Sequence, residues 1–345
     1  MTGAMYAAVS GLKAHMDALN VIGNNIANVN THAYKATRYT FLEALYTNVR
    51  SGSNGSAESG GKNPAQIGYG ASIGTIDLDM STKTYSPTGH DTDCMIDGDG
   101  FFIMGGKQDG PFTSPGELKN MYLSRLGNIE FDNDGYLKDG QGRIVYGFLN
   151  VVGDGADANN VDNTEPCTKL TAIRLPMASD GTDDAKLGSA VYPTEGDDTG
   201  DVLDATEGVN GRIVPDSVAI DEKTGRITCT SSAGETVVVG YIALAKVDNP
   251  NGVTHVDGHY YKALDGAGNV HLTSLGGEIE SEEDAAIPIL SAGETKLVTG
   301  GLESSGTNLA SEISNMIMVQ RGYQANTRIV SVTDSMLEEL VNMKR

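Results

Sequence analysis

The sequence predicts an α+β fold in which two terminal helices enclose a β-rich middle. Apolar residues recur at intervals of three and four near both ends of the 345-residue chain, as they do along one stripe of a helix. Between the ends, short apolar runs alternate with turn-forming residues, and the chain contains 44 glycines. With 39% hydrophobic residues the chain can form real cores, and its length favours two or three domains.

The N-terminal stripe starts at residue 5, and its steps of three and four are close to a heptad repeat. Its members are Met5, Val9, Leu12, Met16, Leu19, Ile22, Ile26 and Val29. The C-terminal stripe consists of Leu309, Ile313, Met316, Tyr323, Val330, Leu337 and Val341. An amphipathic helix gains most of its stability from packing, so both stripes need a cover. They pack either against each other as a coiled coil or separately on the β-rich body, and periodicity alone leaves both arrangements open.

The middle of the chain changes character several times. Residues 51–61 have the composition of a flexible linker. Short apolar runs follow within residues 99–149, with a hairpin-like turn signal at residues 132–135. Residues 150–210 are acidic and poor in long apolar runs, and strand character returns at residues 236–244. These segments predict a β-rich body that is interrupted by an acidic insertion.

The formal net charge of −22 excludes whole classes of partner. Nucleic acid and anionic membranes bind clustered Lys and Arg, so neither is an expected partner. The charge keeps free monomers apart, and added salt should weaken this repulsion if the protein assembles. No apolar run is long enough to span a membrane, and we expect no cleavable signal peptide.

Catalytic, cofactor and metal sites are not predicted. The three cysteines are widely spaced, and we expect free, mostly buried thiols. His255 and His259 have the spacing of a zinc motif, but Pro250 and Gly258 argue against the helix that this motif needs. The segment 132–135 resembles a calcium loop, yet Gln141 occupies the position that requires glutamate, so a hairpin turn is the better interpretation.

Each end of the chain carries a distinctive run of residues. At the N-terminus this run lies in residues 10–35 and comprises Asn24, Asn25, Asn28, Thr31, Tyr34 and Lys35. At the C-terminus, in residues 302–345, it includes Gln320, Arg321 and Asn326. Both runs resemble the flagellar rod and hook protein family, and the C-terminal one closely resembles that of hook proteins. The family usually has glycine where this chain has Ala33, which predicts strain there if the turn keeps a positive φ.

The resemblance implies a nested α+β multidomain architecture. Terminal helices in residues 1–40 and 301–345 would form an inner coiled-coil domain, connected through residues 41–85. Residues 86–149 with 210–300 would form a β-rich middle domain, and residues 150–209 an outer acidic insertion domain. The implied function is a structural, non-enzymatic subunit of the curved extracellular hook, which transmits torque from rod to filament. The alternatives are a distal rod protein and, from another class, an acidic calcium-binding or adhesive surface module.

The resemblance also implies partners and a location. The partners would be copies of the chain itself in a helical homopolymer, the rod protein, the hook–filament junction protein and the hook cap. Export through the flagellar type III apparatus would place the protein outside the cell without a cleaved signal peptide. Some hook proteins form a covalent link between a cysteine and a lysine of the next subunit, and Cys167 beside Lys169 is the candidate here. Nearby acidic residues should raise its pKa, so we predict an inert thiol.

Overall fold

A computed structural model describes residues 2–55, 60–107, 112, 115–152, 164–179, 190–191, 209–213, 215–231, 236–277, 279, 287–291 and 293–343. The chain forms two compact units. We call residues 1–79 with 305–345 unit 1 and residues 80–304 unit 2. Within the described ranges, none of the helices combines the length and the apolar character that crossing a bilayer requires.

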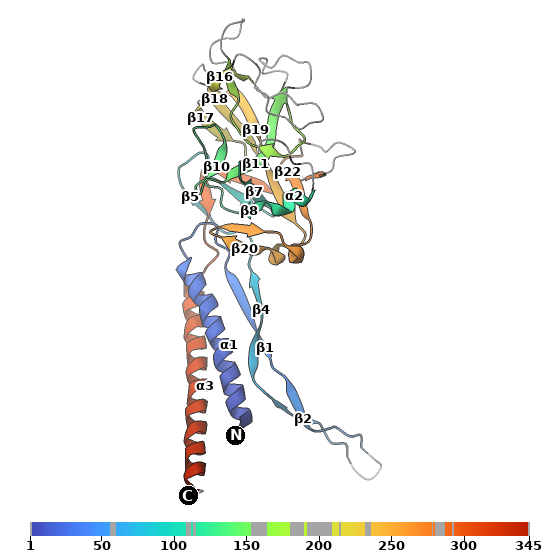
Figure 1. Cartoon of the computed structure of the whole chain (residues 1–345), viewed down its shortest axis with the longest axis vertical. Coiled ribbons are helices and arrows are strands. Elements are labelled where there is room, and N and C mark those ends of the chain that lie inside the picture. The colour runs from blue at the N-terminus through green and yellow to red at the C-terminus, as the bar shows by residue number, and fades with distance from the viewer. Residues whose placement is uncertain are drawn as a thin grey trace. The chain divides into compact units, whose positions relative to one another are not determined.

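Unit 1 consists of two long helices and two antiparallel strand pairs (Figure 1). The helices α1 (Thr2–Ala27) and α3 (Leu309–Met343) lie side by side although they come from opposite ends of the chain. Strand β1 (Thr37–Glu43) pairs with β4 (Ala71–Leu78), and β2 (Tyr46–Arg50) pairs with β3 (Ala65–Gly68). Asn308 caps the start of α3, since its side-chain Oδ1 accepts the Ser311 N–H at 3.2 Å.

Unit 2 is built on a large, mostly antiparallel sheet whose central strands run in the order β17-β18-β19-β11-β7-β8-β21-β20. The bounds of these strands are β7 (Phe101–Gly105), β8 (Tyr122–Ser124), β11 (Ile144–Val152), β17 (Pro215–Ile220), β18 (Arg226–Ser231), β19 (Thr236–Val247), β20 (Thr254–Asp257) and β21 (Tyr260–Lys262). The strands β9 (Ile129–Phe131), β10 (Leu137–Asp139), β12 (Thr164–Pro166), β13 (Thr171–Ala172), β22 (Val270–Ser274) and β23 (Ile289–Ser291) join this path from the side.

Smaller elements complete unit 2. Three short strands, β14 (Met177–Ser179), β15 (Ala190–Val191) and β16 (Val209–Arg212), form a separate sheet. The pairs β5–β25 (Tyr85–Pro87 with Gly301–Glu303) and β6–β24 (Cys94–Asp97 with Lys296–Thr299) join segments that are about 200 residues apart. Helix α2 (Pro115–Asn120) and the 3-10 turns η2 (Pro250–Gly252) and η3 (Asp265–Ala267) lie in connections.

The main core lies in unit 2, where strands that are buried on both faces read as nearly continuous apolar runs. Strand β7 is buried at every position, and β19 carries buried residues on both faces over much of its length. Phe102, Val145 and Leu244 from the three central strands belong to one cluster of buried side chains. Because the sheet is assembled from segments far apart in the sequence, no local pattern shows its order.

The fold agrees with several features that the sequence predicts. The mixed composition is confirmed: a helix lies near each end, and the middle is rich in strands. The hairpin at residues 132–135 is confirmed, since the Gly135 N–H donates to the Asp132 carbonyl at 2.8 Å and β9 pairs with β10. The segment 236–244 lies within β19. In the predicted linker 51–61, Ser53 forms a β-bridge with Lys62, which directly follows the segment, and residues 56–59 lie outside the described part.

The predicted acidic insertion 150–209 includes residues that belong to the main sheet. Strands β12 and β13 both pair with β11, and Ile173 and Leu175 lie in the same buried cluster as Phe102. Much of the remaining insertion lies outside the described residues. The four-part division of the chain stays a prediction, to which the structure adds the two units defined above.

Candidate assembly surface

The contact between α1 and α3 combines small residues with a few larger apolar ones. On α1 the buried positions include Ala8, Gly11, Ala14 and Ala18, followed by Ile22. On α3 the buried positions are Val319 and Thr333. Small side chains let two helix backbones approach closely, and their spacing of three and four keeps them on one face. The contact therefore uses little of the large apolar surface that the two helices carry.

Two glycines mark where this approach is closest. A Cβ atom at Gly11 would lie 2.8 Å from the Nδ2 atom of Asn326 on α3. A Cβ atom at Gly322 would lie 2.6 Å from the imidazole Cε1 of His15 on α1. Neither distance occurs in ordinary packing. A side chain larger than hydrogen at either position would therefore collide with the partner side chain on the other helix.

Asn25 connects four segments of unit 1. Its amide donates to the Thr37 carbonyl at 2.8 Å and to Glu312 Oε1 at 3.3 Å. Its Oδ1 accepts from the Thr37 N–H at 3.0 Å, the Thr37 hydroxyl at 3.1 Å and the Tyr34 hydroxyl at 3.0 Å. Only 1% of Asn25 is exposed. It joins the end of α1 to the following turn, to β1 and to the first turn of α3.

The other signature residues around this turn bond mainly to one another. Asn28 Nδ2 donates to the Asn24 carbonyl at 2.9 Å, and Thr31 donates to Asn28 Oδ1 at 3.2 Å. Burial, together with the Glu312 carboxylate, raises the pKa of Tyr34, so its hydroxyl remains a donor at neutral pH. The Asn-rich signature thus ends α1 and shapes the turn, which is the local role expected of Asn side chains.

Ala33 adopts a left-handed conformation, which the sequence had left open. Its φ is +57°, and Ala33 is the sole described non-glycine residue with a positive φ. The side chain is buried. A left-handed conformation costs an L-residue about 1–2 kcal/mol relative to its usual regions. The turn geometry is therefore kept where the family usually has glycine, and the surrounding contacts hold the strained backbone.

Large apolar side chains remain exposed on both helices. On α1 they are Met5, Tyr6, Val9 and Met16. On α3 they are Leu309, Ile313, Ile317, Met318, Tyr323, Ile329, Val332, Met336, Leu337, Leu340, Val341 and Met343. Single exposed apolar residues are common, but contiguous sets of this size mark interaction surfaces. We call these sixteen residues the exposed helix faces.

The residues that the sequence analysis selected fall into three groups. Met5, Val9, Met16, Leu309, Ile313, Tyr323 and Leu337 lie on the exposed helix faces. Leu12, Leu19, Ile26, Met316 and Val330 are half-buried, and Leu19, Ile26 and Met316 pack around the contact between the helices. Of the signature residues, Asn25 and Lys35 are buried, Asn326 lies against Gly11, and Gln320 and Arg321 are exposed. Their role in assembly stays a prediction.

The net charge is divided unequally between the two units. Unit 1 contains nine basic and nine acidic residues, whereas unit 2 contains 15 basic and 37 acidic residues. All of the net charge of −22 therefore belongs to unit 2, and the unit that bears the exposed helix faces is neutral. Copies of unit 1 can approach one another without the repulsion between like charges that unit 2 carries.

The three cysteines are free and buried, as predicted. Burial raises the pKa of the Cys94 thiol far above its usual range and that of Cys229 to about 11. Cys167 packs with Leu149 and Val151 and has an exposed fraction of 1%. Its burial argues against reaction with a lysine of another copy, and the inert thiol stays a prediction.

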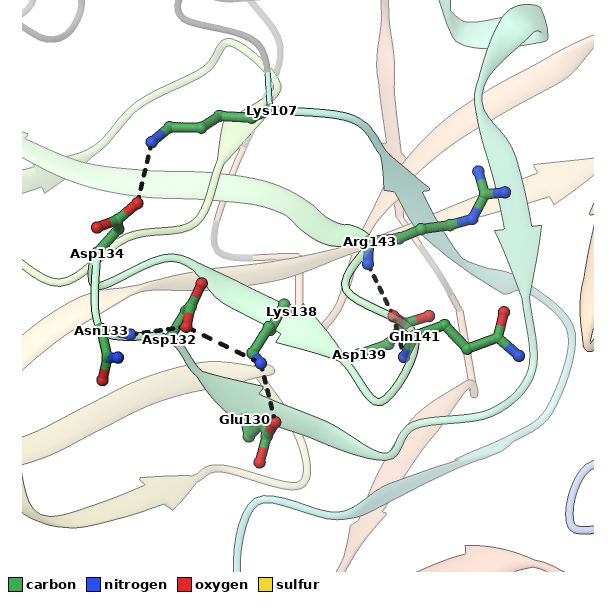
Figure 2. A network of polar contacts seen from close by, with 9 residues as sticks. All are labelled: Lys107, Glu130, Asp132, Asn133, Asp134, Lys138, Asp139, Gln141 and Arg143. Atoms are coloured by element: carbon green, nitrogen blue, oxygen red, sulfur yellow. Dashed lines mark hydrogen bonds and ion pairs between the residues drawn. The ribbon is translucent and has the colours of Figure 1, made fainter.

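The acidic turn that resembled a calcium loop is held by ion pairs (Figure 2). Asp134 lies 3.3 Å from the Lys107 ammonium, and Lys138 lies 3.2 Å from Glu130 and 3.9 Å from Asp132. The described residues contain no group of three or more metal-ligating side chains. His255 lies in strand β20 and not in a helix.

Comparison with known proteins places both helices in one family. A family model described as "Flagella basal body rod protein" matches residues 5–35, which include most of α1. A second, described as "Flagellar basal body rod FlgEFG protein C-terminal", matches residues 298–343, which include all of α3. The chain belongs to the flagellar rod and hook protein family.

Relatives of this flagellar protein carry both names. It is 29% identical to the flagellar basal-body rod protein FlgG of Bacillus subtilis over 345 residues, which cover both chains completely. It is 23% identical to the flagellar hook protein FlgE of Borreliella burgdorferi over 456 residues, again covering both chains. Over 150 residues, 43% of this chain and 31% of the relative, it is 33% identical to the hook protein FlgE of Helicobacter mustelae.

These matches give the flagellar protein a structural role in the flagellar axis, at the basal body or the hook. The sequence analysis overlooked the small residues that join its helices. Their signal was present, because Ala8, Gly11, Ala14 and Ala18 have helical spacing beside the stripe of larger residues. The connecting role of Asn25 had no such signal, since its partner Glu312 lies 287 residues away.

Proposed function

We propose that this chain is a subunit of the flagellar hook that polymerises through unit 1 into a helical tube outside the cell. The observation that carries this proposal is the set of exposed helix faces on a unit without net charge. In the polymer, α1 and α3 of neighbouring copies pack against one another as coiled coils. The chain acts by position and contact and catalyses no reaction.

The free energy available from apolar burial is sufficient for assembly. Complete burial of one large apolar side chain is worth about 1.5–3 kcal/mol, and association costs an estimated ~4–15 kcal/mol. The sixteen exposed residues are already partly covered, with exposed fractions between 36% and 78%, so burial of most of them would offset that cost. A head-to-tail contact between one helix face and a different face of the next copy repeats indefinitely and produces a tube or filament.

Hook rather than rod is supported by the C-terminal helix. Gln320, Arg321 and Asn326 lie in a segment that resembles hook proteins more closely than rod proteins. The same resemblance supplies the proposed partners: the rod protein, the junction protein, the cap and the type III export apparatus. Export by that route needs no cleaved signal peptide.

A specific observation favours the distal rod as the second candidate. The alignment with the Bacillus rod protein is 345 residues long and leaves little room for a segment that this chain lacks. The alignment with the Borreliella hook protein extends over 456 residues, so that relative contains long additional segments. By length, the chain is therefore closer to the rod relative.

Electron microscopy of the assembled protein separates these candidates. The purified chain, concentrated until it polymerises, should form short curved tubes if it is a hook protein. Straight tubes of the same material would assign it to the rod. A protein that stays monomeric at high concentration and in high salt, where the repulsion between copies of unit 2 is screened, would overturn the proposal.

A further inference from the structure

Three side chains of unit 2 form a cationic cluster around one aromatic ring. Tyr122 lies on β8, Lys262 lies on the neighbouring strand β21, and Arg143 directly precedes β11. The guanidinium carbon of Arg143 is 3.5 Å from the centre of the Tyr122 ring and 4.2 Å from the centre of the Tyr260 ring, and the Lys262 ammonium is 4.6 Å from the Tyr122 ring. All three residues are partly exposed. We call them the cation–tyrosine cluster.

The carboxylates near this cluster are already engaged. Asp139 is fully buried and accepts hydrogen bonds from the backbone N–H of Gln141 and Arg143, from His259 and from the Tyr260 hydroxyl. Figure 2 shows the Arg143 guanidinium pointing away from Asp139 and the acidic residues of the neighbouring hairpin paired with lysines. Neither Arg143 nor Lys262 forms an ion pair with a carboxylate of the described residues.

This arrangement is unusual because of the charge of unit 2. The unit has 37 acidic and 15 basic residues, so carboxylates are abundant and cations are few. Two cations that share one ring repel each other, and ring contacts compensate such repulsion only in part. The Arg143 guanidinium can form a two-pronged contact with a carboxylate, and the Lys262 ammonium adds a second charge beside it.

We propose that the cation–tyrosine cluster accepts a carboxylate from unit 2 of a second copy of this chain. The proposal rests on the proposed polymerisation and adds a contact between the acidic units. Charge complementarity identifies the partner: every copy brings a unit with a net charge of −22, and the cluster is a place where that charge is attracted. The contact fixes the position of one copy of unit 2 relative to the next, whereas the exposed helix faces hold the polymer together.

The test measures the critical concentration for polymerisation by sedimentation, as a function of sodium chloride. R143Q with K262Q should raise it at least about tenfold at low salt, because two charged contacts are lost. The ratio of variant to wild type should approach one as salt increases, since screening weakens the contact in the wild type. R143K keeps the charge but loses the planar fork, so its effect should be intermediate.

K223Q is the matched control, because Lys223 is exposed, lies in another turn of unit 2 and makes no ion pair with a described residue. An R143Q/K262Q variant that behaves like K223Q at every salt concentration would overturn the inference while leaving the proposed function intact. So would a salt-independent increase accompanied by a lower melting temperature of the free subunit, which indicates a purely structural role. Failure of the wild type to polymerise would instead overturn the proposed function.

Discussion

Replacement of Asn25 by alanine should weaken assembly strongly, because this side chain connects the two helices that assembly requires. Asn25 makes five hydrogen bonds and is 1% exposed. The Tyr34 and Thr37 hydroxyls and the Glu312 carboxylate can turn towards water in the variant. The backbone N–H and carbonyl of Thr37 cannot, and an unsatisfied buried group costs about 1–3 kcal/mol. We therefore expect a loss of about 3 kcal/mol in the ordered state of unit 1.

The loss should appear in the critical concentration for polymerisation. We predict that the terminal segments are largely disordered in the free subunit, because their apolar faces lack a cover there. Ordering then occurs on assembly, and about 3 kcal/mol corresponds to a rise of about 100-fold. Sedimentation of polymer from free subunit measures this quantity. The melting temperature of unit 2 should not change.

Asn24 provides the matched control, since it is the same residue type at the preceding position and is exposed. N24A should remain within about threefold of the wild type, as expected for exposed hydrogen bonds. N25D keeps the shape but places an acceptor against the Thr37 carbonyl and Glu312, so it should be as harmful as N25A. An N25A protein that polymerises within about threefold of the wild-type concentration would refute the reasoning.

Three further perturbations test other parts of the structure. G322A should weaken the helix pair, because the added Cβ would lie 2.6 Å from an imidazole ring. G23A, whose added Cβ meets no atom within 4 Å, should instead stabilise α1 by about 1 kcal/mol. Helix content by circular dichroism and critical concentrations that change in the same direction for both variants would contradict this. Burial alone would raise the pKa of Asp139, but hydrogen bonds from His259, Tyr260 and two backbone N–H groups hold it below its usual value. The stability it contributes is therefore present above about pH 4 and is lost as the pH falls through its folded-state pKa. D139N should therefore melt below the wild type at pH 7, and the difference should shrink as the pH falls below about 4; a difference that does not change with pH would count against it. Deletion of residues 150–209 should unfold unit 2, because it removes core residues of the main sheet. Deletion of residues 180–208 alone should leave a cooperative melting transition. A cooperative transition after the larger deletion would show that the removed core residues are dispensable.

Local patterns predicted much of the fold. The terminal helices follow from spacings of three and four, and the turn at residues 132–135 follows from Asp, Asn and Gly between two strands. These features depend on neighbours within a few residues, so the sequence contains the necessary information. The positive φ of Ala33 was not predicted, because alanine in place of the family's usual glycine left the geometry of that turn open.

The candidate site was predicted less completely, because its contacts are not local. Periodicity identified the large apolar stripes, but it did not show that alanine and glycine let the two helices approach closely within one chain. The partners of Asn25 lie 12 and 287 residues away. The cluster of Tyr122, Arg143 and Lys262 likewise forms only once β8 and β21 are paired. Pairing of distant segments decides these features, and one sequence does not display it.

The measurement that tests the central claim most directly is a helical reconstruction of the polymer by electron cryomicroscopy. The account predicts that α1 and α3 pack between copies, with Val9, Met16, Ile313, Val332 and Met336 buried against neighbouring subunits. A tube in which these five side chains face solvent, and in which unit 2 alone makes the contacts between copies, would contradict it.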